Sequence, residues 1–216
     1  RELLGQALAL NRARGDRTAE AANLNNLGMV AQHQGDFAAA RALFDEGRAL
    51  CRALGNRVWE AAILNNLGMA ARGQGDADGA RLLLEEALGV HREIGNRAWE
   101  AACLNNLGAL ATLQGDPRAA RELHLLALEI CGELGDRQEL AGALEGLAAA
   151  AEPLRAARLW GAADTLRAAV GSPLPAGERE AHERQVEAAR RALGDHDAFD
   201  DAWRAVPREA NRRRHV

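Results

Sequence analysis

A six-residue motif recurs in this chain at intervals of forty residues, and this recurrence limits the possible folds more than any other feature. Residues 23–28 read NLNNLG, and residues 63–68 and 103–108 read ILNNLG and CLNNLG. Gln-Gly-Asp follows each motif, and Gly-Asp-Arg or Gly-Asn-Arg precedes it. A glycine can close one helix and the next Asp or Asn can cap another, so two such corners in each period predict two helices in each period. The chain is therefore expected to be a stack of helical hairpins.

Composition favours helices and excludes several kinds of chemistry. Alanine is abundant, proline occurs 5 times and aromatic residues make up 3%, so we expect helix almost throughout and essentially no strand. Lysine is absent, which excludes a phosphate-binding loop of the GxxxxGK[ST] type and any lysine Schiff base within these residues. The one serine, Ser172, lies in a segment rich in Pro and Gly and not in a nucleophile motif. We expect neither an enzyme nor a cofactor.

Charge and cysteine content indicate where such a chain functions. The net charge of −4 argues against a nucleic-acid-binding domain, which would be basic. Three widely spaced cysteines do not form a disulfide framework, and no apolar run approaches the ~20 residues of a membrane span. A cytoplasmic protein that does not contact membranes is expected.

The repeat alignment also predicts the order of the parts. Helix A of the first full repeat should cover about residues 17–34, and helix B about 37–54. Because residues 1–14 align with 41–54, the chain is expected to begin inside a helix B and to come from a longer protein. The expected parts are helix B of a truncated repeat (1–16), three repeats (17–56, 57–96 and 97–136), a degenerate repeat (137–170), a helical C-terminal cap (171–206) and a basic tail (207–216).

The motif and its corners resemble tetratricopeptide repeats of the longer, roughly forty-residue kind, over residues 1 to about 170. The resemblance implies an all-α, right-handed helical-hairpin solenoid whose A helices line a concave groove for a protein or peptide. The segments AARLWGAA (156–163) and GSPLP (171–175) are similar to the end of the repeat arrays in large bacterial AfsR-type and LuxR-type transcription regulators. This second resemblance implies a sensor or interaction region joined to a switch ATPase domain in the parent chain.

Each motif contains a pair of asparagines, and these are the main binding candidates. The second member matches the position at which related peptide-binding repeats place an Asn that bonds the ligand backbone. A carboxamide both donates and accepts, so a row of them suits an extended peptide. Alternatively, one or both members bond neighbouring helices within the stack. The candidates are Asn25 and Asn26, Asn65 and Asn66, and Asn105 and Asn106.

The same A-helix face is expected to include residues one or two turns further along. Met29 and His33 follow the first Asn pair, and Met69 and Arg72 follow the second. Methionine adapts to variable partners, although two methionines at helical spacing also suit ordinary packing.

Four apolar side chains are candidates for an interface. Trp59 and Trp99 begin equivalent A helices and either anchor a partner or cover the end of the preceding helix B. Leu125 and Leu126 stand where other B helices carry acidic pairs, so they need a cover. The C-terminal helices could supply it, or else a dimer or an interdomain contact.

Metal and nucleic-acid sites are not expected. Cys51, His91 and Cys131 occupy equivalent positions of successive B helices, on the order of 10 Å apart, which is too far to share a metal ion. A glutamate in the first turn of three A helices suits the helix dipole. The arginine-rich run at 212–215 indicates an exposed disordered tail or a vector-derived end, and contact with nucleic acid is the alternative.

Overall fold

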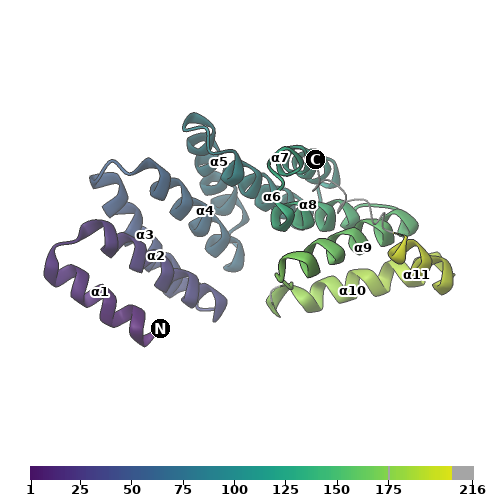
Figure 1. The fold of residues 1–216 in the computed structure, drawn as a ribbon, viewed down its shortest axis with the longest axis horizontal. Coiled ribbons are helices and arrows are strands. Elements are labelled where there is room, and N and C mark those ends of the chain that lie inside the picture. Colours follow the sequence, from purple (N-terminus) through teal and green to yellow (C-terminus); the bar gives the residue numbers. More distant parts are fainter. Residues whose placement is uncertain (175, 206–216) are drawn as a thin grey trace, which may run out of the picture. The chain divides into compact units, whose positions relative to one another are not determined.

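The computed structural model describes residues 1–174 and 176–205, and over these residues it contains eleven α-helices and no strand (Figure 1). The expected all-helical hairpin fold is confirmed. The predicted basic tail, 207–216, lies outside the described residues. The helices are α1 (Glu2–Arg14), α2 (Arg17–His33), α3 (Phe37–Ala53), α4 (Arg57–Gly73), α5 (Ala77–Glu93), α6 (Arg97–Leu113), α7 (Pro117–Leu134), α8 (Arg137–Ala149), α9 (Pro153–Val170), α10 (Ala176–Leu193) and α11 (His196–Arg204).

The corners between helices form as the sequence predicts. Asn56, for example, accepts a hydrogen bond from the backbone N–H of Trp59 at 3.2 Å, and Asp76 accepts one from Gly79 at 2.9 Å. The glycine before each Asp or Asn cap of helices α2 to α8 has a positive φ, as at Gly55 with 66°. An L-residue with a Cβ is strained in this left-handed conformation, which explains the glycine at each corner from α1–α2 to α7–α8.

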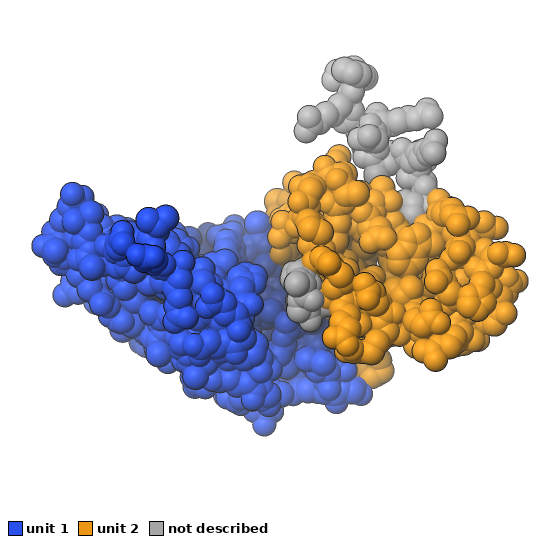
Figure 2. All heavy atoms as spheres, turned by 90° about the horizontal axis from the view of Figure 1, so that it is seen from below, with its two compact units in different colours: residues 1–115 blue, residues 116–216 orange. Residues whose placement is uncertain are grey.

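The chain divides into two compact units, residues 1–115 and 116–216 (Figure 2). In the first unit each helix packs against the next, and the A helices α2, α4 and α6 also contact one another in order. Its core contains fully buried Leu24, Phe44, Ile63, Leu64 and Leu84.

The glycine that ends the LNNLG motif allows helices A and B of a hairpin to approach closely. A Cβ on Gly28 would lie 2.4 Å from Cε1 of Phe44, and one on Gly68 would lie 2.7 Å from Cγ of Leu84. Atoms cannot approach so closely, so the motif requires glycine for packing and not for a turn.

The first-turn glutamates have a role beyond the helix dipole, because each is buried between two arginines. Glu20 pairs with Arg12 of the preceding helix at 2.9 Å and with Arg17 of its own helix at 3.2 Å. The Arg12 hydrogen bond holds the pKa of Glu20 below its ordinary value. Glu60 and Glu100 repeat the arrangement with arginines forty residues on. These ion pairs therefore join successive repeats.

The second unit ends in a cap built on α9. Helices α10 and α11 both pack against α9, and buried Trp160 and Phe199 lie in their shared core. A Cβ on Gly161 would lie 2.0 Å from the carbonyl oxygen of Trp203, so this glycine lets α11 approach. Leu125 and Leu126 on α7 remain 37% and 46% exposed. The interpretation that the C-terminal helices cover these leucines was therefore wrong: α11 binds where Gly161 leaves room.

Candidate functional site

The two members of each asparagine pair have different surroundings. Helix α2 carries the first pair, α4 the second and α6 the third, always in the middle of the helix. The first members, Asn25, Asn65 and Asn105, are only 7%, 5% and 8% exposed. The second members are accessible: Asn26 is exposed, and Asn66 and Asn106 are partly exposed. Adjacent helical residues point about 100° apart, so one member of each pair enters the stack while the other faces its surface.

Hydrogen bonds join the pairs from one repeat to the next. Nδ2 of Asn66 donates to Oδ1 of Asn25 at 2.8 Å, and Nδ2 of Asn106 donates to Oδ1 of Asn65 at 2.9 Å. The Cys103 thiol lies 3.6 Å from the same Asn65 oxygen. We call this series of bonds the amide ladder. It gives the buried Asn25 and Asn65 a partner and fixes the orientation of Asn66 and Asn106.

The amide ladder uses one N–H of each donor side chain. Asn66 and Asn106 therefore keep a carbonyl oxygen and a second N–H with which to bond a ligand. Asn26 precedes the first rung, and its exposed side chain makes no bond in the ladder. The sequence left open whether the asparagines bond neighbouring helices or a ligand. Asn25 and Asn65 bond the neighbouring helix, whereas Asn66 and Asn106 make one such bond and keep accessible polar atoms.

The neighbouring candidates lie on the same helices. Met29 is 41% exposed and its sulfur accepts a hydrogen bond from Asn25 Nδ2 at 3.6 Å. His33 is exposed at the end of α2, whereas Met69 and Arg72 on α4 are partly buried. We use the name Asn face for the surface made by the accessible asparagines and these neighbours: Asn26, Met29, His33, Asn66, Met69, Arg72 and Asn106.

The two tryptophan candidates differ in exposure. Trp59 is 38% exposed, whereas Trp99 is partly buried and stacks on His91 with ring centroids 5.6 Å apart. His91 lies in the last turn of α5, so Trp99 contacts the end of the preceding helix B.

The buried thiols and imidazoles are suited to packing rather than to chemistry. Burial raises the pKa of Cys131 to about 12 and lowers that of His124 to about 4, so both are neutral near pH 7. Burial also raises the pKa of Cys51 and lowers that of His91. Within residues 1–174 and 176–205, no three His, Cys, Asp or Glu side chains are grouped as metal ligands.

The fourth repeat replaces the asparagine pair with Glu145 and Gly146. The Glu145 carboxylate binds Arg167 of α9 through both oxygens, at 2.6 and 2.7 Å. A Cβ on Gly146 would lie 2.2 Å from Nε2 of His124, so the imidazole occupies the space beside it. An ion pair and a buried ring therefore replace the asparagines in α8.

None of the helices that the structure describes is both long enough and apolar enough to span a lipid bilayer.

Comparisons with known proteins agree with this geometry. The model of the tetratricopeptide repeat family matches residues 17–93 and 60–133, which together are more than half of the chain. The crystal structure of BtubC (BKLC) from P. vanneervenii resembles it with a TM-score of 0.73 at 20% sequence identity, over 93% of this chain and 85% of that one. At this identity the likeness shows the fold alone. A comparison with curated protein sequences found no match. The recurring helical hairpins and the family match show that the chain belongs to the tetratricopeptide repeat family.

Proposed function

We propose that this chain is a non-catalytic recognition module that binds an extended protein segment along the Asn face. Tetratricopeptide repeats generally mediate protein–protein interaction, and they are typically scaffolds without catalytic activity. The observation that carries the proposal is the amide ladder, because it holds accessible carboxamides in a fixed orientation on adjacent helices.

The chemistry of the Asn face suits a peptide backbone. An extended segment presents alternating N–H and C=O groups, and each carboxamide can accept from one and donate to the other. The ladder bond restricts the rotation of the Asn66 and Asn106 side chains before a ligand arrives, which reduces the entropy lost on binding. Met29 and Met69 add adaptable apolar contacts beside the amides.

The closing segment supports a more specific context within the same proposal. Its similarity to the end of the repeat arrays in AfsR-type and LuxR-type regulators suggests a sensor or interaction region of a cytoplasmic bacterial signalling protein. In that context, a ligand that prefers one curvature of the repeats would shift the population of an attached ATPase switch domain.

The proposal can be tested by selecting peptides from a random display library with the full chain. We expect Asn26→Ala to weaken binding of the selected peptides by about 5- to 10-fold, because one hydrogen bond contributes about 1 kcal/mol. Asn26 makes no ladder bond, so this variant leaves the repeat contacts intact. Asn66→Ala should weaken binding at least as much.

A matched control is Gln74→Ala, which removes an exposed amide just beyond α4 and outside the Asn face. Circular dichroism should show unchanged helicity in all three variants. Equal affinity of the wild type, Asn26→Ala and Asn66→Ala for the selected peptides would refute the proposal.

A second candidate function is self-association through α7, and the exposure of Leu125 and Leu126 favours it. Adjacent exposed leucines beside the charged Arg121, Glu122 and Glu129 of the same helix suit a contact between two copies. This candidate predicts a dimer whose population rises with concentration in analytical ultracentrifugation and falls with Leu125→Glu. A monomer at all concentrations would exclude it.

A further inference from the structure

The A helices of the first unit present a stripe of accessible residues that contains no Asp, Glu, Lys or Arg. On each helix the stripe follows successive turns through the accessible asparagine, at the positions four and seven before it and three and seven after it. All of its residues are exposed or partly exposed. We call it the A-helix stripe, and it consists of Ala19, Ala22, Asn26, Met29 and His33 on α2, Trp59, Ala62, Asn66, Met69 and Gly73 on α4, and Trp99, Ala102, Asn106, Ala109 and Leu113 on α6.

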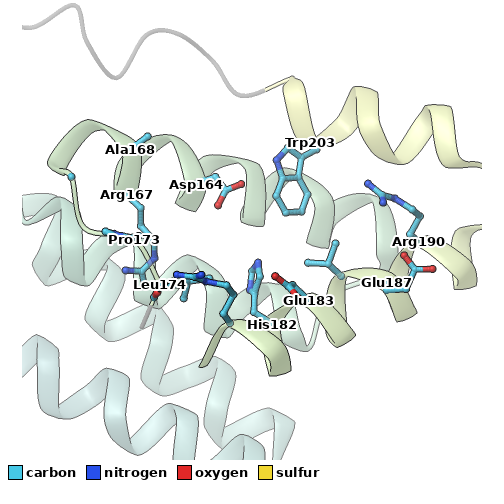
Figure 3. A pocket seen from close by; sticks show the side chains of 13 residues that line it. Asp164, Arg167, Ala168, Pro173, Leu174, His182, Glu183, Glu187, Arg190 and Trp203 are labelled. Carbon is cyan, nitrogen blue, oxygen red and sulfur yellow. Dashed lines mark hydrogen bonds between the residues drawn. The ribbon is translucent and has the colours of Figure 1, made fainter. Parts of the chain in front are cut away.

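The lack of these charged residues is particular to the A-helix stripe, because they make up 27% of the chain. The exposed surface of the B helices carries them, as at Asp45 on α3 and Glu85 on α5. In the second unit, a cavity of about 940 Å³ between α9, α10 and α11 is lined by side chains of both signs, among them Asp164, Arg167 and Glu183 (Figure 3). The composition of the chain therefore does not explain a surface of three helices without them.

The charged residues next to the A-helix stripe are engaged within the protein. Arg72 is partly buried and already interacts with another group of the chain. Glu60 and Glu100, in the first turns of α4 and α6, are buried in their ion pairs with arginines. A ligand on the stripe therefore meets carboxamides and apolar groups.

The residues that replace charge on this surface are typical of the centre of a protein interface. Such centres are depleted in charged residues and enriched in aromatic residues and methionine. Trp59 is 38% exposed and Met29 is 41% exposed. On α4 the small Ala62 lies between Trp59 and Asn66 along the stripe, which leaves space for a side chain of the ligand. A charged side chain at this place would lose water without gaining an opposite charge.

The spacing of the A helices sets the length of segment that the stripe can hold. Helices α2, α4 and α6 contact one another in order, and packed helices lie about 8–10 Å apart. An extended chain advances about 3.3 Å per residue, so one repeat corresponds to about three residues of a ligand. The distance from Asn26 to Asn106 therefore corresponds to a segment of about seven residues.

We propose that the A-helix stripe selects an extended protein segment that is uncharged over about seven residues. Apolar side chains of this segment lie over Ala62 and Ala102, between the tryptophan and the asparagine of each helix, while the carboxamides bond its backbone. Asp, Glu, Lys and Arg are disfavoured at the positions that face the stripe. This specificity rests on the recognition proposed for the Asn face and names the chemical class of its ligand.

A charge scan of a peptide selected with the full chain tests the proposal. Each position of the peptide is replaced in turn by Asp or Asn and by Lys or Met, so that each pair has a similar shape and differs in charge. At the positions that face the stripe, we expect Asp to bind at least about tenfold more weakly than Asn, and Lys at least about tenfold more weakly than Met. Because the net charge of the chain is −4, long-range attraction would favour Lys, so a loss with both signs reports the contact surface itself.

The scan distinguishes failure of this specificity from failure of recognition. Tolerance of both Asp and Lys at every position, or a loss with only one sign, would overturn the specificity. If Asn66→Ala still weakens binding of the same peptide, recognition by the Asn face stands and only the specificity fails. Equal affinity of the wild type and Asn66→Ala, or failure to select any peptide, would overturn both.

Variants of the protein locate the effect on the A-helix stripe. Met29→Glu and, independently, Met69→Glu each place a carboxylate on the stripe, so the loss caused by Lys should shrink to about twofold at a facing position while the loss caused by Asp grows. Leu82→Glu on α5 is the matched control, because it places the same charge on a side chain that is 68% exposed and lies on a B helix. Circular dichroism should show unchanged helicity in all three variants. Unchanged losses in both Met29→Glu and Met69→Glu, or an equal change in Leu82→Glu, would overturn the proposal.

Discussion

The buried imidazole of His124 makes the stability of the second unit depend on pH. The side chain is 2% exposed, and burial lowers its pKa from an ordinary value of 6.5 to about 4. In the unfolded chain His124 binds a proton near pH 6.5, whereas in the folded chain it resists protonation down to about pH 4. Its contribution is therefore fully present above pH 6.5, falls as the pH decreases through this window, and is constant below it.

The size of the effect follows from the two pKa values of His124. A pKa difference of one unit corresponds to about 1.4 kcal/mol, so the full effect is about 3 kcal/mol and the part expressed by pH 5 is about 2 kcal/mol. His124→Leu removes the titration and places the residue that α5 carries at the equivalent position, Leu84. Leu84 also packs against a glycine, Gly68, as His124 packs against Gly146.

Urea denaturation followed by circular dichroism at pH 7.5, 6 and 5 measures this contribution. The difference in unfolding free energy between His124→Leu and the wild type should shift in favour of the variant by about 2 kcal/mol between pH 7.5 and pH 5. His33→Gln, which changes an exposed histidine of α2, is the control and should show no such shift. A pH-independent difference for His124→Leu would refute the reasoning.

Two further predictions concern contacts within the repeats. Glu100→Gln removes the charge that Arg92 and Arg97 bind, so the free energy of unfolding should fall by about 2 kcal/mol at neutral pH in urea denaturation. Burial favours a higher pKa for Glu100, but its arginine partners outweigh burial and lower the pKa. The difference in unfolding free energy between the wild type and Glu100→Gln should therefore shrink as the pH falls below about 4.5. A difference that does not change with pH would contradict the ion-pair account. Gly68→Ala should lower the melting temperature through a loss of about 1–3 kcal/mol, whereas Gly89→Ala, where no atom lies within 4 Å, should stabilise the helix by about 0.5–1 kcal/mol. Equal effects of the two alanines would contradict the packing role of the motif glycine.

The helices and their corners could be predicted because their signals are local. The cap at Asn56 and the left-handed Gly55 are adjacent in sequence, so the fold of the corner does not depend on distant residues. The expected helix of residues 17–34 accordingly corresponds to α2, Arg17–His33.

The bonding of the asparagines could not be predicted from one repeat. Asn66 donates to Asn25, a residue 41 positions earlier, and this register depends on how α2 and α4 stack. The sequence shows that two adjacent asparagines recur, but not which of them is buried. The distinction matters for function, because the accessible member is the one that can bind a ligand.

The ion pairs between repeats could have been predicted from the sequence, because their arginine and glutamate recur, and change, together. The pair Arg92 and Glu100 has equivalents forty and eighty residues earlier, and forty residues later both positions change, to Gly132 and Leu140. A buried carboxylate needs its partner, so the two positions change as a pair.

The position of the C-terminal helices depends on how closely two backbones can approach and not on the repeat pattern of the sequence. The exposed Leu125 and Leu126 suggested where a cover was needed, but α11 docks on α9 because Gly161 admits the Trp203 backbone. Such a close approach of backbone to backbone leaves no periodic trace in the sequence.

The measurement that tests recognition by the Asn face most directly is a double-mutant cycle between a selected peptide and Asn66. Each backbone N–H of the peptide is replaced in turn by N-methyl, and the affinity is measured with the wild type and with Asn66→Ala. If a peptide N–H donates to Asn66 Oδ1, one position should show a coupling free energy of about 1 kcal/mol and its neighbours none. Additive losses at every position would contradict the claim that this carboxamide holds the peptide backbone.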